Sequence, residues 1–137
     1  MDEYKVKRSG RVALKVQGER VVEAGGRFHA GQECNRWYDL AVYRAAESGK
    51  IVVAASYETR WQGEESQYAA EVVGSMEEVP SAFDELEAEL SVLTANYGYP
   101  PGDQYSDKQA RMLAQLRAVW QSRVSAVCDE LGIAEEV

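Results

Sequence analysis

The chain has 137 residues and 45% hydrophobic content, which fits one soluble globular domain large enough to fold without metal ions or disulfide bonds. Its 15 Lys and Arg against 23 Asp and Glu give a formal charge of −8, which excludes a uniformly basic nucleic-acid-binding domain. No apolar run approaches the roughly 18–20 residues of a membrane span, and two cysteines are too few for a disulfide framework, so we expect a cytoplasmic protein without membrane attachment.

Residues 1–74 alternate apolar and polar side chains in short runs separated by glycines, which is typical of β-strands. In the clearest short run, Val12, Leu14 and Val16 share one face. Consecutive strands joined by short turns favour an antiparallel meander of about five or six strands. The predicted strands and turns, in chain order, are Tyr4–Arg8, Ser9-Gly10, Arg11–Val16, Gln17-Gly18, Glu19–Glu23, Arg36–Ala45, Glu47–Lys50, Ile51–Trp61, Gln62–Ser66 and Gln67–Val73.

After residue 75 the apolar spacing becomes helical. Pro80 suits the first turn of one helix, which Gly98 ends, and a capping box at Ser106 begins a second helix, which Gly132 ends. The second helix would hold about 26 residues and span nearly 39 Å, which is long for this domain and favours a homodimer through it. The apolar stripes of the two helices are Phe83, Leu86, Leu90, Leu93 and Tyr97, then Leu113, Leu116, Trp120, Val124, Val127 and Leu131.

These elements predict one α+β domain over residues 1–137. An antiparallel β-meander sheet of about five or six strands would form residues 1–74, and two C-terminal helices in residues 75–132 would pack on it, followed by a frayed tail at 133–137. The helical stripes should supply much of the core. The strand residues expected to join them are Val12, Leu14, Leu40, Val42 and Val53.

Charge is unevenly distributed along the chain. Residues 1–50 carry ten Lys and Arg and seven Asp and Glu, a net +3, whereas residues 51–137 carry five and sixteen, a net −11. One explanation is that these carboxylates form the solvated faces of a strand and a helix. The other is an acidic band that binds a basic protein partner, as in an inhibitor or accessory protein that imitates nucleic acid. The band comprises Glu58, Glu64, Glu65, Glu71, Glu77, Glu78, Asp84, Glu85, Glu87 and Glu89.

The N-terminal half supports an alternative hypothesis, a nucleic-acid-binding module. Cations that accompany aromatic rings on a sheet can stack single-stranded bases. Half-buried strands also use such rings as core, and the acidic half would repel phosphate, so we favour core packing and expect no nucleic-acid partner. The residues concerned are Lys5, Lys7, Arg8, Arg11, Lys15, Arg20, Arg27 and Arg36, with Trp37, Tyr38, Tyr43, Tyr57 and Trp61.

A small enzyme centred on His29 and Cys34 is the second alternative. These residues lie five positions apart in the glycine-flanked segment Gly25–Cys34, where a thiol and an imidazole could touch. The more ordinary outcome is a turn histidine and a packed cysteine. The sequence has no metal-ligand spacing, no phosphate-binding glycine loop and no nucleophile elbow, so we expect no metal, no cofactor and no catalysis.

The segment 96–105 is a second candidate binding surface, because its three tyrosines and two prolines make a stiff, amphipathic loop. The tyrosines are Tyr97, Tyr99 and Tyr105. The leading hypothesis is therefore a non-catalytic, homodimeric interaction protein that binds a basic protein partner through the acidic band. This layout is compatible with small accessory proteins of bacteria and their mobile elements.

Overall fold

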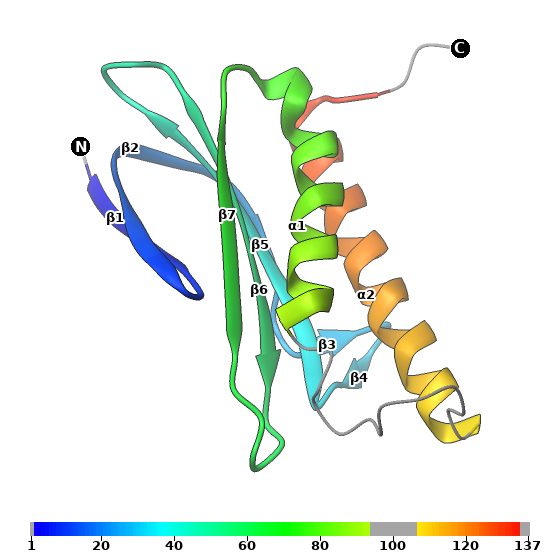
Figure 1. Cartoon of the computed structure of the whole chain (residues 1–137). Coiled ribbons are helices and arrows are strands. Elements are labelled where there is room, and N and C mark those ends of the chain that lie inside the picture. The colour runs from blue at the N-terminus through cyan, green and yellow to red at the C-terminus, as the bar shows by residue number, and fades with distance from the viewer. Residues whose placement is uncertain (1, 94–106, 135–137) are drawn as a thin grey trace.

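The computed structural model describes residues 2–93 and 107–134. Five antiparallel strands form one curled sheet in the order β1-β2-β5-β6-β7, and two helices cover one of its faces (Figure 1). The predicted α+β architecture is thereby confirmed. The elements are β1 (Asp2–Arg8), β2 (Arg11–Ala24), β3 (Phe28–His29), β4 (Gln32–Glu33), β5 (Arg36–Ala45), β6 (Ile51–Thr59), β7 (Gln67–Val73), the 3₁₀ turn η1 (Met76–Glu78), α1 (Val79–Leu93) and α2 (Asp107–Leu131).

The predicted turn at Gln17-Gly18 is wrong, because β2 continues through it as one strand of 14 residues. Gly18 pairs with β1 on one side and with β5 on the other. A Cβ at Gly18 would lie 2.0 Å from the backbone oxygen of Arg44, so the glycine permits a close approach of strands. Glu19–Glu23 is consequently the second half of β2, which pairs with β5, rather than a separate neighbour of Arg11–Val16.

The main core lies between the sheet and the helices. α1 packs on β6 and β7, and α2 packs on β5 and β2 (Figure 1). Both predicted helical stripes contribute to this core, where Phe83 and Trp120 are buried with their ring centroids 6.1 Å apart, edge to face. Other predicted core residues that are buried are Leu40, Val42, Val53, Leu86, Leu90 and Val127.

Two predicted core residues lie outside the core. Val12 is 83% exposed, since it lies beside the tip of the β1–β2 hairpin, where burial along β2 falls from Val16 through Leu14 to Val12. Leu113, in the first turns of α2, is 39% exposed. The side chain of Leu93 lies outside the part that the structure describes.

The curl of the sheet creates a second, smaller core on the face away from the helices. Val6, Val16, Val52 and Ala70 are its buried residues. The tip of the β1–β2 hairpin reaches β7, where the backbone N–H of Ser9 donates to the carbonyl oxygen of Tyr68 at 2.9 Å. Both faces of the central strands are therefore partly covered.

The helix ends agree with the predicted signals where the structure describes them. α1 begins at Val79, one residue before Pro80, and Gly132 follows α2 with a φ of 70°. Ser106 and Gly98 lie outside the described residues. The apolar stripe of α2 packs on the chain's own sheet, so the length of this helix requires no second copy, and the homodimer stays a prediction.

The predicted frayed tail is described only in part. The backbone N–H of Ile133 donates to the carbonyl oxygen of Cys128 at 2.9 Å, and its side chain packs against the main core. Residues 135–137 are outside the described range. Within residues 2–93 and 107–134, no helix has both the length and the apolar character that a membrane crossing needs.

Candidate functional site

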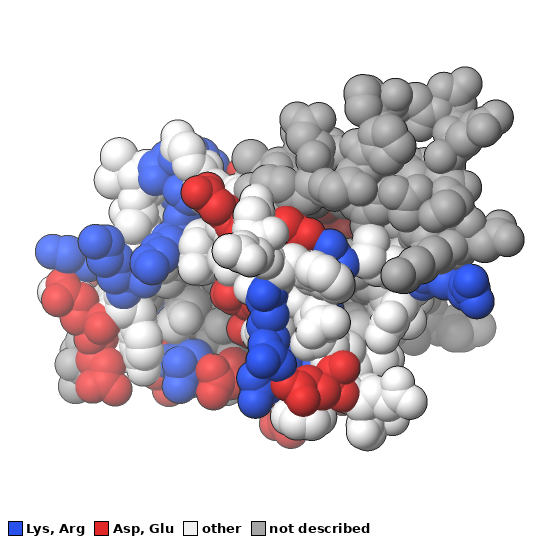
Figure 2. Space-filling view, turned by 90° about the horizontal axis from the view of Figure 1, so that it is seen from below, with Lys and Arg blue, Asp and Glu red and all other residues white. Residues whose placement is uncertain are grey.

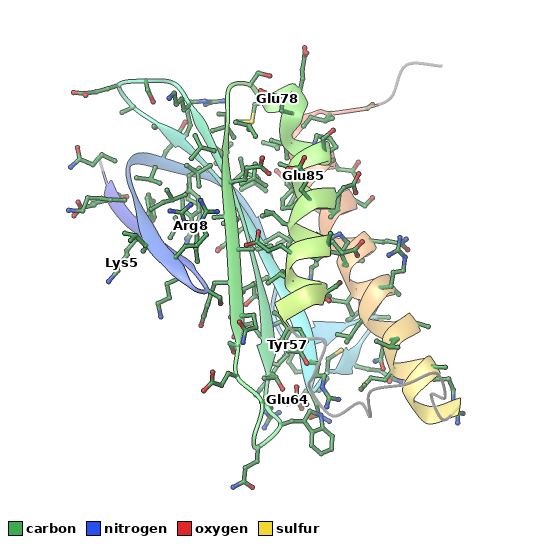
Figure 3. The ribbon with its side chains drawn as sticks, in the orientation of Figure 1. Lys5, Arg8, Tyr57, Glu64, Glu78 and Glu85 are labelled. Atoms are coloured by element: carbon green, nitrogen blue, oxygen red, sulfur yellow. The ribbon has the colours of Figure 1, made fainter. Side chains whose placement is uncertain are left out.

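The ten residues of the predicted acidic band do not share one surface. Glu64 and Glu65 lie in the β6–β7 connection, whereas Glu77 and Glu78 lie at the other end of β7, in η1. Figure 3 shows Glu64 beside Tyr57 at one end of the sheet and Glu78 at the opposite end. The band therefore divides into separate groups with different surroundings.

Glu64 lies inside a polar network, and its side chain is only 9% exposed. The guanidinium of Arg36 forms an ion pair with it, and the Nε–H donates to the carboxylate at 3.1 Å. The hydroxyl of Tyr57, which is buried, donates to Glu64 at 2.8 Å, and the hydroxyl of Thr59 donates at 3.1 Å. This carboxylate joins β5, β6 and the β6–β7 connection.

The electrostatics of Glu64 agree with that structural role. Burial alone would raise its pKa, but the hydrogen bonds from Arg36 and Tyr57, together with the positive charge of Arg36, more than offset burial and lower the pKa. Arg36 also lies over the ring of Trp61, 5.1 Å from its centroid. The Glu64 carboxylate is therefore occupied by contacts within the chain that stabilise the fold.

Three further residues of the band have partners within the chain. The hydroxyl of Ser66 donates to Glu58 at 2.9 Å, and Arg117 of α2 forms an ion pair with Glu87 at 3.1 Å. The carboxylate of Glu78 accepts the backbone N–H of Gly74 at 2.8 Å, which caps the turn before α1. These contacts neutralise or occupy the carboxylates locally.

Four carboxylates lie close together along β7, η1 and α1, and we call them the acidic cluster: Glu71, Glu85, Glu89 and the capping residue Glu78. Burial raises the pKa of Glu71, and a hydrogen bond with Glu85 and the negative charges of Glu85, Glu89 and Glu78 raise it further. Among the ion pairs of the described residues, none involves Glu71, Glu85 or Glu89. The cluster is thus a site of uncompensated negative charge.

The rest of the band, Glu65, Glu77 and Asp84, is exposed. Glu77 and Asp84 lie in η1 and α1, near the acidic cluster in sequence, whereas Glu65 lies at the far end of β7. Seen from below in Figure 2, acidic and basic side chains intermingle on the visible described surface. Of the predicted band, only the carboxylates along β7, η1 and α1 therefore remain as a candidate binding surface.

We expect Glu71→Gln to stabilise the protein at pH 7 by about 0.5 kcal/mol, because it removes one of several repelling charges at the surface. A carboxyl whose pKa is raised in the folded state begins to disfavour folding as the pH rises through its ordinary value of about 4.3, and does so fully above the raised value, so the gain should be lost as the pH falls to about 4. Urea unfolding of both proteins at pH 4 and 7 measures this. Glu65→Gln is the control. An equal gain in stability from this variant would contradict the explanation that repulsion within the acidic cluster causes the effect of Glu71→Gln.

A hollow of 660 Å³ lies on the concave face of the sheet, away from the helices. Three directly paired residues cross it as a polar row: Asp39 of β5 faces Ser56 of β6, which faces Tyr68 of β7. The ammonium group of Lys7 in β1 lies 5.3 Å from the ring centroid of Tyr68. This volume is within the range of small-molecule pockets.

The hollow exists because the row beside the polar row carries only small side chains. Ala41 of β5 pairs with Ala54 of β6, which pairs with Ala70 of β7. Ala41 and Ala54 line the hollow, where their methyl groups leave space that larger strand residues would fill, whereas Ala70 is buried in the second core. This hollow was not predicted from the sequence, although alanines in the middle of all three strands were a visible signal.

His29 and Cys34 have different surroundings in the structure. His29 lies in β3, opposite Gln32 of β4. Cys34 is 4% exposed, and its sulfur lies 4.0 Å from the amide nitrogen of Gln115 in α2. Neither residue lines the hollow. Nothing in this arrangement supports nucleophilic chemistry between them.

The aromatic residues of the nucleic-acid hypothesis are also divided between environments. Tyr38 and Tyr57 are buried in the main core, where their ring centroids lie 5.9 Å apart. Trp61 is 50% exposed, beside Arg36. Trp37 packs against the main core and Tyr43 against the second core, so the five rings are divided among different environments. The other predicted binding surface, with Tyr97, Tyr99 and Tyr105, lies outside the described residues.

Comparison with known proteins adds no further assignment: the chain matches no protein-family model, no curated protein sequence and no solved structure.

Proposed function

We propose that the protein is a non-catalytic interaction protein whose β7–α1 surface binds a basic protein partner. The observation that carries the proposal is the acidic cluster, in which burial and the neighbouring carboxylates raise the pKa of Glu71, while none of the ion pairs of the described residues involves Glu71, Glu85 or Glu89. Such crowding disfavours the free protein. Lys or Arg side chains of a partner would relieve it, and this difference in free energy favours binding.

The surroundings of the cluster support a protein partner. Glu77 and Asp84 add exposed carboxylates beside it on η1 and α1. Figure 3 shows Glu85 on α1 and Glu78 at its start, so these two carboxylates lie along the N-terminal part of this helix. An acidic surface of this kind accelerates encounter with a basic partner and suppresses contact with nucleic acid. A cytoplasmic location and a homodimeric state belong to the same proposal.

Charge reversal tests the proposal. In the variant Glu85→Lys/Glu89→Lys, we expect capture of basic proteins by the immobilised full chain to fall at least tenfold, because attraction becomes repulsion at the cluster. The control Glu47→Lys/Glu130→Lys makes the same change in net charge at exposed positions elsewhere. Capture is quantified at equal ionic strength, by mass spectrometry of the eluted proteins.

The two variants distinguish a local surface from overall charge. Loss in the first variant alone supports binding at the cluster. Equal loss in both would mean that capture depends only on the net charge of −8, and unchanged capture in the first variant would refute the cluster as the binding surface. Melting curves of both variants confirm that they are folded.

A further inference from the structure

The hollow on the concave face is chemically asymmetric across the strands. Asp39 supplies a carboxylate at the β5 end of the polar row, and Lys7 supplies an ammonium group beyond the β7 end. On β5, Asp39 alternates with Tyr38 and Leu40, which are buried in the main core, so its side chain is on the concave face. The two opposite charges therefore lie on opposite sides of the hollow.

Both charges retain binding capacity. Asp39 accepts the backbone N–H of Gly26 at 2.7 Å through one oxygen, and a carboxylate can accept several such bonds. Lys7 belongs to none of the ion pairs within the described parts of the chain. Lys5 also borders the hollow, but Figure 3 shows it pointing away from the sheet, whereas the ammonium group of Lys7 lies over the Tyr68 ring.

The spacing of these groups sets the length of the ligand. Asp39 and Tyr68 are two strands apart, which corresponds to about 10 Å at the usual separation of neighbouring strands. Lys7 lies beside Tyr68 at the far end. Three extended residues span about 10 Å. Free amino acids are too short to reach both charges.

We propose that the hollow binds a short peptide of about three residues with free termini. The α-amino group lies at Asp39, the α-carboxylate lies at Lys7, and the Ser56 hydroxyl between them is available to the peptide backbone. Small apolar side chains of the peptide contact Ala41 and Ala54, which line the hollow. This site is separate from the acidic cluster, because Glu71 alternates on β7 with Ala70 of the concave core.

Nuclear magnetic resonance titration of the full chain with trialanine tests the proposal. We expect the amide signals of Ala54, Ser56 and Tyr68 to shift on addition of trialanine. Acetylation of its amino end or amidation of its carboxyl end should each weaken binding about tenfold or more, because each removes one charged hydrogen bond. Absence of shifts at 10 mM trialanine would overturn the proposal, and so would equal affinity for the blocked peptides.

Two variants assign the binding to the hollow. Lys7→Met should weaken trialanine binding about tenfold and leave the affinity for the amidated peptide unchanged, since only the free carboxylate uses this ammonium group. Ala54→Leu should abolish binding by filling the floor, whereas Ala88→Leu, at an exposed position of α1, should not change it. Binding that survives in both Lys7→Met and folded Ala54→Leu would place the peptide elsewhere and refute the site.

Discussion

Replacing Trp120 by Ala is expected to lower the free energy of unfolding by about 3–5 kcal/mol, the range for truncating a buried aromatic residue. Trp120 is 3% exposed in the main core. Its ring meets Tyr38 edge to face at a centroid distance of 4.9 Å and Phe83 at 6.1 Å. The substitution thus removes the contact at which α1, α2 and β5 meet, and it leaves a cavity there.

Urea unfolding followed by circular dichroism measures the effect of Trp120→Ala. The control is Leu113→Ala in the same helix, where 39% exposure predicts a loss of less than about 1 kcal/mol. A Trp120→Ala protein as stable as the wild type would contradict the position of α2 on the sheet. A similar loss in both variants would indicate a general effect on the helix instead.

Glu64→Gln is expected to reduce stability by about 2–3 kcal/mol, because it removes the carboxylate that forms an ion pair with the partly buried Arg36. Arg36 is 15% exposed in its side chain, and water can compensate the lost ion pair only in part. Glutamine preserves the size of the residue and an acceptor for the Tyr57 hydroxyl. The measured loss would therefore report the charge rather than a cavity.

The pH dependence of the Glu64→Gln effect has a definite sign. The pKa of Glu64 is lowered in the folded state, so its stabilising contribution is complete above the ordinary carboxyl pKa of about 4.3 and is lost as the pH falls through the lowered value. The difference between wild type and variant should shrink below pH 4. Unfolding measured from pH 3 to 7 tests this. Glu65→Gln, at an exposed position, should show no comparable dependence.

Local sequence patterns predicted the elements whose signals depend on near neighbours. The alternation in β5, β6 and β7 gave strands that begin where expected, and the spacing of Phe83 and Trp120 gave two buried helical stripes. Gly18 was misinterpreted because glycine serves both turns and close strand approach. Only the position of Arg44 on the neighbouring strand distinguishes these two uses.

The candidate sites depended more strongly on contacts distant in sequence. Ten carboxylates were visible as a charge bias, but the distinction between Glu64, which is paired, and Glu71, which is crowded, requires Arg36 and Glu85 to be placed beside them. These partners are 28 and 14 residues away. Charge composition alone carries no information about such pairings.

The sequence by itself determined the fold class, the meander order of the main strands and the two apolar helix faces, because hydrophobic alternation and helical spacing are local properties. Tertiary structure decided how the sheet curls, which carboxylates remain uncompensated and where the hollow forms. Ala41 and Ala54 became neighbours in the lining of the hollow only when antiparallel register placed their strands side by side. Packing and electrostatic interactions depend on distances in space, and these distances are set only once the chain has folded.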